Sequence, residues 1–293
     1  MIVDAHAHVI VPGLGADVEW TDGAQIVRYG GREIRSALRE FGDVTRIVEE
    51  QDASGVDVVV LSPWVNLCGV EVERHNESLA SYVSDRVWAL GTAETPEQLV
   101  ELMRDGRLCG VEIPATQLGA AQDDFWSAAE DTHALVFVHP STRGFALPVM
   151  EEHYLWNTLG NPFETTVNAA RFVLSGAADR HPNVRILLAH GGGVLPALRG
   201  RLAHESQVHD TGIDVRDAIR RFYVDTVVHD VEVLRGLVDF FGADRVLLGS
   251  DYPFDMGVEL PAEIVRALQL SAEDEAAILG GNAKRLLGQE IPA

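Results

Sequence analysis

The chain of 293 residues is short of cysteine, of lysine and of long apolar runs. Its two cysteines, Cys68 and Cys109, are too few for a disulfide framework, and we interpret them as free thiols of a cytoplasmic protein. No apolar run reaches the roughly 20 residues that a membrane helix needs. The chain opens on a strand-like segment rather than a signal peptide, so we expect a soluble cytoplasmic protein.

Positive charge is scarce as well. The formal net charge is -22, and Lys284 is the only lysine. Such a negative field repels nucleic acids and anionic membranes, so neither is expected as a partner. A small anionic substrate is still possible, because arginines can reverse the sign of the field within a pocket.

Apolar residues make up 46% of the chain and fall into alternating strand and helix patterns. This alternation is typical of a parallel sheet built from βα units. Eight strands of this kind predict a closed (β/α)8 TIM barrel. An open doubly wound sheet is the alternative, but it usually carries a glycine-rich phosphate turn after the first strand, where this chain has two histidines. The predicted strands are 2–8, 56–62, 86–92, 108–114, 135–140, 184–190, 222–226 and 245–251.

Two stretches are longer than ordinary loops. Residues 9–43 predict an insertion with small strands over the barrel mouth, and residues 141–162 form a second long loop. Long loops at this face usually bind ligands or partners. The sequence has no repeat or linker, so residues 1–293 are expected to form one barrel domain.

Metal-type residues stand at the ends of the predicted strands. They are His6 and His8 on the first strand, and then His139, His190 and Asp251. Side chains at positions i and i+2 of a strand share a face, and the carboxyl ends of barrel strands open on one side. A titratable group at the end of a buried strand costs several kcal/mol if it has no partner. The pattern therefore predicts coordination of a metal ion such as zinc.

In this order, these segments resemble the amidohydrolase superfamily, and most of all its branch of aminocarboxymuconate-semialdehyde decarboxylase and related nonoxidative decarboxylases. The resemblance runs from residue 3 to about residue 288. Its motifs are Asp4-Ala5-His6-Ala7-His8, Phe137-Val138-His139-Pro140, Ala189-His190-Gly191-Gly192-Gly193, Phe222-Tyr223-Val224-Asp225 and Gly249-Ser250-Asp251-Tyr252-Pro253-Phe254.

The resemblance implies one divalent metal ion per chain, usually zinc, with a water in the remaining position. Its protein ligands would be His6, His8, His139 and Asp251, and His190 would be the acid/base beside the water. Asp251 is expected to share in proton transfer. Nitrogen and oxygen ligands would also suit manganese or iron.

The scarcity of lysine supports a single metal. Binuclear members of the superfamily bridge their ions with a carboxylated lysine on a mid-barrel strand. Lys284 lies near the C-terminus on a predicted helix and cannot take that position.

The resemblance also implies substrate-binding residues. Arg35 and Arg201 align with arginines that hold substrate carboxylates, and a guanidinium group binds a carboxylate with two charge-assisted hydrogen bonds. In the resembled enzymes the second arginine comes from a neighbouring subunit, so a homodimer sharing Arg201 is expected. Trp64 and Trp156 are candidate walls of the pocket.

The expected function is a metal-dependent decarboxylase that releases CO2 from a small unsaturated or aromatic carboxylic acid. A hydrolase of a lactone or amide could use the same metal-bound hydroxide. A noncatalytic barrel is a third reading, which the complete ligand set and His190 oppose. Ser141 stands where the muconate decarboxylases often carry tryptophan, so the substrate itself is not predicted. Other histidines, such as His75, are expected to be solvated or to cap helices.

Overall fold

The computed structural model describes residues 1–21, 24–120 and 123–288. Within these ranges, eight parallel strands coincide with the eight that the sequence predicts. They are β1 (Val3–Val9), β5 (Val58–Pro63), β6 (Val87–Ala89), β7 (Gly110–Pro114), β8 (Leu135–His139), β9 (Arg185–Leu188), β10 (Tyr223–Asp225) and β11 (Val246–Leu247).

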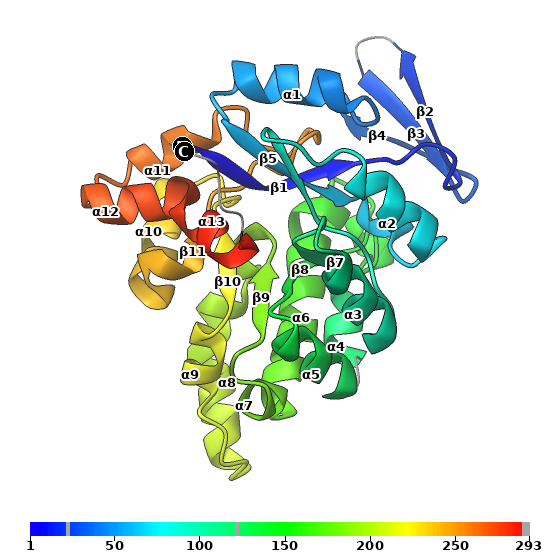
Figure 1. Cartoon of the computed structure of the whole chain (residues 1–293). Helices are drawn as coiled ribbons and strands as arrows, with labels where there is room; N and C mark the ends of the chain where they lie inside the picture. The colour runs from blue at the N-terminus through cyan, green and yellow to red at the C-terminus, as the bar shows by residue number, and fades with distance from the viewer. Residues whose placement is uncertain (22–23, 121–122, 289–293) are drawn as a thin grey trace.

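The parallel strands follow one another around a barrel (Figure 1). One hydrogen-bonded group runs β1-β5-β6 and the other runs from β7 to β11 in chain order. A parallel bridge between Gly91 and Val111 joins the ends of β6 and β7, and another between Ala7 and Tyr252 joins β1 to the segment after β11. The strand order returns to β1, so the predicted TIM barrel is confirmed.

Helices surround the strands on the outside (Figure 1). No helix in the described ranges is long and apolar enough to cross a membrane. The helices are α1 (Val44–Ala53), α2 (Val72–Ala80), α3 (Pro96–Asp105), α4 (Ala115–Ala120), α5 (Asp123–Asp131), α6 (Asn161–Leu174), α7 (Ala177–Arg180), α8 (Leu195–Val208), α9 (Val215–Arg220), α10 (Val231–Phe241), α11 (Pro261–Arg266), α12 (Ala272–Ala276) and α13 (Asn282–Leu287).

Local sequence explains where several helices begin. Before α3, the Thr95 hydroxyl accepts from the Gln98 backbone N–H, and the Gln98 side chain accepts from the Thr95 N–H. Pro96 occupies the first helical position, where no intrahelical N–H bond is lost. Ser271 caps α12 by accepting from the Asp274 N–H at 3.1 Å. In both cases a hydroxyl side chain satisfies a backbone N–H group of the first turn that has no partner within the helix.

The apolar core has two layers. One lies between the strands and the surrounding helices, and the other fills the barrel interior with side chains such as Trp88, Phe137 and Tyr223. Leu286 and Leu287 of α13 join the interior cluster together with the first residues of β1 and β8. Apolar packing therefore fills the amino end of the barrel, and the polar strand ends are left at the opposite mouth.

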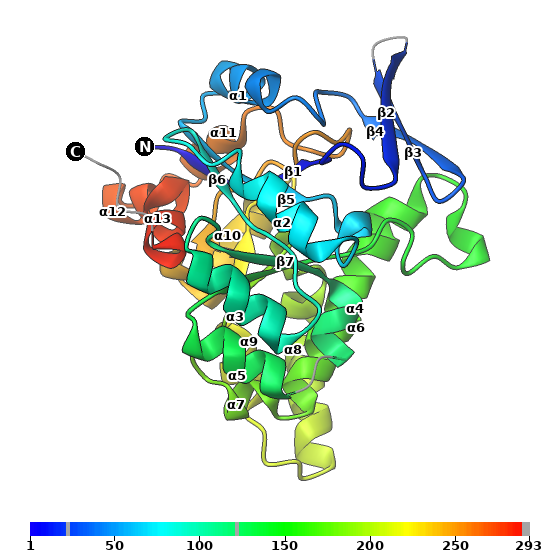
Figure 2. The ribbon, with the colours of Figure 1, turned by 45° about the vertical axis from the view of Figure 1, so that its right-hand side comes forward.

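The predicted insertion contains a small antiparallel sheet. It consists of β2 (Ala16–Thr21), β3 (Ala24–Tyr29) and β4 (Arg32–Ala37), which stand at the upper edge of the molecule in Figure 2. A bridge between Ala37 and Phe254, and a 3.0 Å bond from the Leu38 N–H to the Pro253 carbonyl, tie it to the loop after β11. The insertion therefore lies at the mouth of the barrel.

Candidate metal centre

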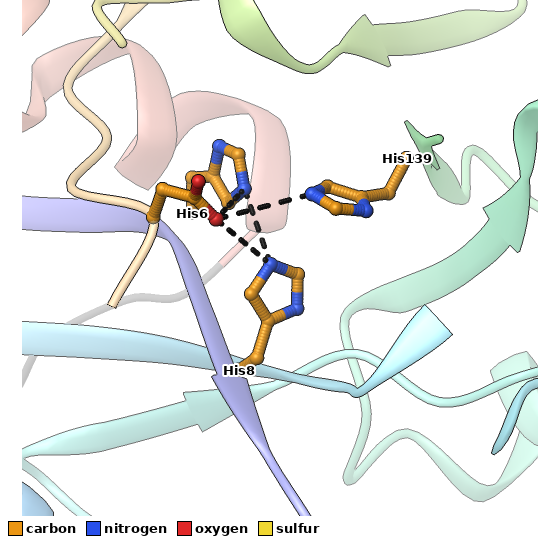
Figure 3. Close-up of side chains that lie close together, drawn as sticks. His6, His8 and His139 are labelled. Carbon is orange, nitrogen blue, oxygen red and sulfur yellow. Dashed lines mark hydrogen bonds and ion pairs between the residues drawn. The ribbon is translucent and has the colours of Figure 1, made fainter. Parts of the chain in front are cut away.

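Four of the residues predicted at strand ends come together at the barrel mouth. His6 and His8 lie on β1, His139 ends β8, and Asp251 follows β11. One donor atom from each lies within 4.8 Å of the others, and all four residues are buried. Figure 3 shows the three imidazole rings turned toward one another.

The surroundings of His6 and His139 fix which ring nitrogen carries the proton. Nδ1 of His6 is 2.6 Å from Oδ2 of Asp225, and Nδ1 of His139 is 2.9 Å from the carbonyl of Pro140. Carboxylate and carbonyl oxygens only accept, so both Nδ1 atoms donate. The Nε2 lone pairs are left facing the centre of the cluster.

The same reasoning applies to His8. Its Nδ1 lies 3.1 Å from the hydroxyl oxygen of Ser62, whose proton is donated to the Ala7 carbonyl at 3.1 Å. The Ser62 oxygen therefore accepts from His8, and Nδ1 of His8 carries the proton. Its Nε2 also turns a lone pair toward the centre.

With the three imidazoles neutral, as metal ligands must be, four acceptors converge with no hydrogen between them. The Nε2 atoms of His6 and His8 are 3.2 Å apart, and Oδ1 of Asp251 lies 3.2 Å and 3.5 Å from them. The Nε2 atom of His139 is 3.9 Å from the same oxygen. Lone pairs this close repel one another unless a cation lies among them. Three imidazole nitrogens and one carboxylate oxygen fit a divalent metal of the zinc type.

Electrostatics favour positive charge at the same point. Burial would lower the pKa of His6, but the carboxylates of Asp251 and Asp225 outweigh it and raise that pKa to about 10. Burial would raise the pKa of Asp251, yet the charge on His6 and contacts with His190, His6 and His8 hold it well below its usual range. The cluster is thus built to hold a cation beside an ionised carboxylate.

His190 lies next to this cluster without belonging to it. Its Nε2 is 3.4 Å from Oδ2 of Asp251, the oxygen that faces away from His6 and His8. The backbone N–H groups of His190 and Gly191 donate to Asp225 at 3.0 Å and 2.9 Å. One buried carboxylate, Asp225, therefore fixes both the ligand His6 and the turn that carries His190.

Two cavities open at the barrel mouth. A cavity of about 280 Å³ is lined by His190 and Asp251 and has mostly apolar walls, including Phe163 and Val227. A polar cavity of about 1090 Å³ lies between the insertion and the loops after β5, β8 and β11. Because only the smaller one reaches His190 and Asp251, it is the candidate chamber for chemistry.

Comparison with known proteins places the chain in a family. The sequence profile described as Amidohydrolase matches residues 3–289. The chain belongs to this amidohydrolase family.

The named relatives of the chain include decarboxylases. It is 29% identical over 272 residues to the 2-amino-3-carboxymuconate-6-semialdehyde decarboxylase of Dictyostelium discoideum, covering 82% of this chain and 75% of that protein. It is 26% identical over 182 residues to the gamma-resorcylate decarboxylase of Rhizobium radiobacter, covering 55% and 53%.

A solved structure with the same fold is the 5-carboxyvanillate decarboxylase of Novosphingobium aromaticivorans in complex with manganese and 4-hydroxy-3-methoxy-5-nitrobenzoic acid. Its TM-score is 0.78 at 18% identity, and the match covers 99% of this chain and 96% of that one.

The predicted substrate-binding residues occupy different places in the structure. Arg35 lines the polar cavity, but its side chain is 68% exposed and pairs with Glu33 at 3.1 Å. Trp156 lines the same cavity beneath the guanidinium of Arg143, 4.8 Å away. Arg201 is exposed on α8 and lines neither cavity of the mouth.

Trp64 lies in the core. It is 1% exposed and packs against the rings of Tyr29 and Phe41 at 5.6 Å and 6.2 Å. It lines neither of the two cavities described above. Of the two predicted tryptophans, Trp156 alone therefore faces a cavity of the mouth.

Two further residues close to the cavities or to the metal ligands were not identified from the sequence. Arg143 lies in the loop after β8 and lines the polar cavity. Glu112 is wholly buried in the middle of β7, and its Oε2 lies 3.5 Å from Nδ1 of His8. A signal for Glu112 was present, since it is a lone carboxylate within an apolar strand. Burial and the Glu112 charge raise the pKa of the nearby Cys68 thiol, which disfavours the thiolate.

Proposed function

We propose that this protein is a metal-dependent nonoxidative decarboxylase, which releases CO2 from a small aromatic or unsaturated carboxylic acid. The observation that carries the proposal is the position of Asp251, which shares one oxygen with the ligand histidines and turns the other to His190 beside an apolar cavity. The decarboxylases named among its relatives support the same reaction class.

We propose zinc as the metal, held by His6, His8, His139 and Asp251 with one position left for water or substrate. Manganese would also suit these donors, and a related decarboxylase of the same fold binds it. When bound, the ion supplies Lewis-acid chemistry, polarising a substrate oxygen or lowering the pKa of its water.

The residues of the chain account for the remaining steps. The apolar walls of the smaller cavity hold the ring or chain of the acid and exclude water. When the bond to the carboxylate breaks, the electron pair stays on carbon, and that carbon must gain a proton. His190 lines the cavity and supplies the proton, while Asp251, 3.4 Å away, orients its imidazole and shares the charge.

We further propose a homodimer with composite sites. A carboxylate at the far end of the substrate would bind Arg35 of the same chain and Arg201 of the neighbouring chain. Support comes from the exposure of Arg201 on α8, which leaves it outside both cavities of its own chain. Cytoplasmic location remains a prediction from the sequence.

The deciding experiment measures CO2 release with the metal-loaded protein. Muconate-type acids and hydroxybenzoates form one panel, and lactones and amides form the second. We expect CO2 in a one-to-one ratio with acid consumed and no turnover of the second panel. Turnover of lactones or amides without CO2 would overturn the proposal and favour the hydrolase.

A further inference from the structure

A second buried carboxylate faces the metal centre from behind. Glu112 is 0% exposed, and its Oε2 lies 3.5 Å from Nδ1 of His8, whose Nε2 faces the metal position. Neither oxygen of Glu112 accepts a hydrogen bond from the described residues. Burying a carboxylate without donors is costly. A positive charge close to the carboxylate would offset this cost.

The surroundings of His8 show where that charge would come from. Its Nδ1 faces three acceptors, namely Ser62 Oγ at 3.1 Å, the Pro63 carbonyl at 3.4 Å and Glu112 at 3.5 Å. Ser62 and Pro63 already satisfy the single N–H of His8, so hydrogen bonding alone does not explain a third acceptor. A cation on Nε2 would make the whole ring more positive, and an anion on the opposite side would then be stabilised.

Asp225 and Glu112 each lie behind a ligand histidine, but their carboxylates have different surroundings. Asp225 backs His6 at 2.6 Å, but it also accepts backbone N–H bonds from His190, Gly191 and Val227. The fold itself therefore stabilises the Asp225 charge. Glu112 has no such bonds in the described structure, and the side chain that faces its carboxylate is His8.

We propose that Glu112 is a positioning residue that tightens metal binding through His8. Its negative charge is a cost to the metal-free protein and is offset when a divalent ion binds to Nε2 of His8. The pair would be a carboxylate–histidine–metal arrangement alongside that of Asp225 and His6. This inference concerns metal retention and holds for either a decarboxylase or a hydrolase.

The test is the Glu112→Gln variant, which keeps the shape of the side chain and removes its charge. Zinc affinity is measured by competition with a chromophoric chelator, and Tm is measured with and without zinc. We expect affinity to fall about 10- to 100-fold, while Tm of the metal-free variant equals or exceeds that of the parent. A purely structural role would instead lower Tm of the metal-free protein.

Two matched variants sharpen the result. Glu164→Gln neutralises another buried carboxylate, which faces Ser141 and the Phe145 backbone rather than a ligand, and should leave zinc affinity unchanged. Ser62→Ala removes the nearer acceptor of His8 and should weaken zinc binding less than Glu112→Gln. Zinc affinity of Glu112→Gln within twofold of the parent would overturn the proposal.

Loss of affinity matched by loss of metal-free stability would also overturn it. If Glu112→Gln does not fold, Glu112→Asp decides by the same criteria. The shorter aspartate side chain keeps the negative charge but holds it farther from His8, so zinc affinity should fall severalfold. Affinity equal to that of the parent would contradict the proposed role.

Discussion

Asp251 and His190 are joined through the carboxylate oxygen that the ligand histidines leave free. Oδ2 of Asp251 lies 3.4 Å from Nε2 of His190, whereas Oδ1 faces His6 at 3.2 Å. Both residues have left-handed backbone, with φ of 57° and 55°, a conformation that is strained outside glycine and concentrates at functional sites. One side chain, that of Asp251, therefore links the metal position to His190.

Replacement of His190 separates chemistry from metal binding. His190→Asn keeps a polar side chain but cannot transfer a proton, so kcat for CO2 release should fall about 10²- to 10⁴-fold. Metal content, measured by atomic emission, should stay near one ion per chain because the four ligands remain. His153→Asn, at a position whose side chain is 82% exposed, is the control and should behave as the parent. A loss below tenfold would remove His190 from its proposed role.

Removal of the metal should lower both activity and stability. The four ligands converge on one point, and an ion that binds the folded state alone adds about 4 kcal/mol when free metal is 1,000 times Kd. Calorimetry before and after dialysis against a chelator should show a lower Tm and no CO2 release. Titration with zinc should restore both at one ion per chain. Recovery only at two ions per chain would contradict the mononuclear site.

How far the sequence predicts this site depends on where each residue lies. His139 and His190 interrupt apolar strands at their ends, so the pattern alone identifies them, and barrel geometry brings them to the same mouth. Glu112 lies in the middle of β7, where a side chain can point to the interior or to the helices, and the sequence does not distinguish the two. The path of the loop that carries Arg143 depends on contacts between distant segments, such as the hydrogen bond that the Thr142 N–H donates to the Asn66 side chain. Local sequence does not predict such contacts.

His75 shows a second limit of prediction from the sequence. It lies on α2, and the expectation that His75 would be solvated or capping is wrong, because its side chain is wholly buried. Polar residues on an amphipathic helix usually face solvent. Packing of α2 against the barrel places this one inside, a tertiary effect that no local pattern reports.

That burial predicts a pH dependence of stability. Burial lowers the pKa of His75 from its ordinary 6.5 to about 4. Between these values the unfolded chain binds a proton that the folded chain does not, so this contribution to stability is complete above pH 6.5 and is lost as the pH falls toward 4. The shift corresponds to a loss on the order of 3 kcal/mol.

The measurement is urea unfolding of the parent and of His75→Phe at several pH values from 7 to 4. The variant should lose less free energy of unfolding over this range than the parent, whatever its stability at pH 7. His153→Phe, at an exposed position, should keep the parent slope. Equal slopes for the parent and His75→Phe would show that His75 is not the buried neutral group.

Arg201 can be assigned to its own site or to a neighbouring one by mixing two inactive variants. If the sites are shared, a homodimer of His190→Asn or of Arg201→Ala has no intact site. A heterodimer of the two variants keeps one intact site, which takes His190 from the Arg201→Ala chain and Arg201 from the His190→Asn chain. Random mixing should restore about one quarter of parent activity. His190→Asn mixed with Asp251→Asn is the matched control, because these side chains lie 3.4 Å apart in the same chain and no mixed dimer has an intact site. If activity recovers in the first mixture but not in the control, Arg201 acts across the interface. If purified, tagged heterodimers show no activity, Arg201 either acts within its own chain or does not belong to the site.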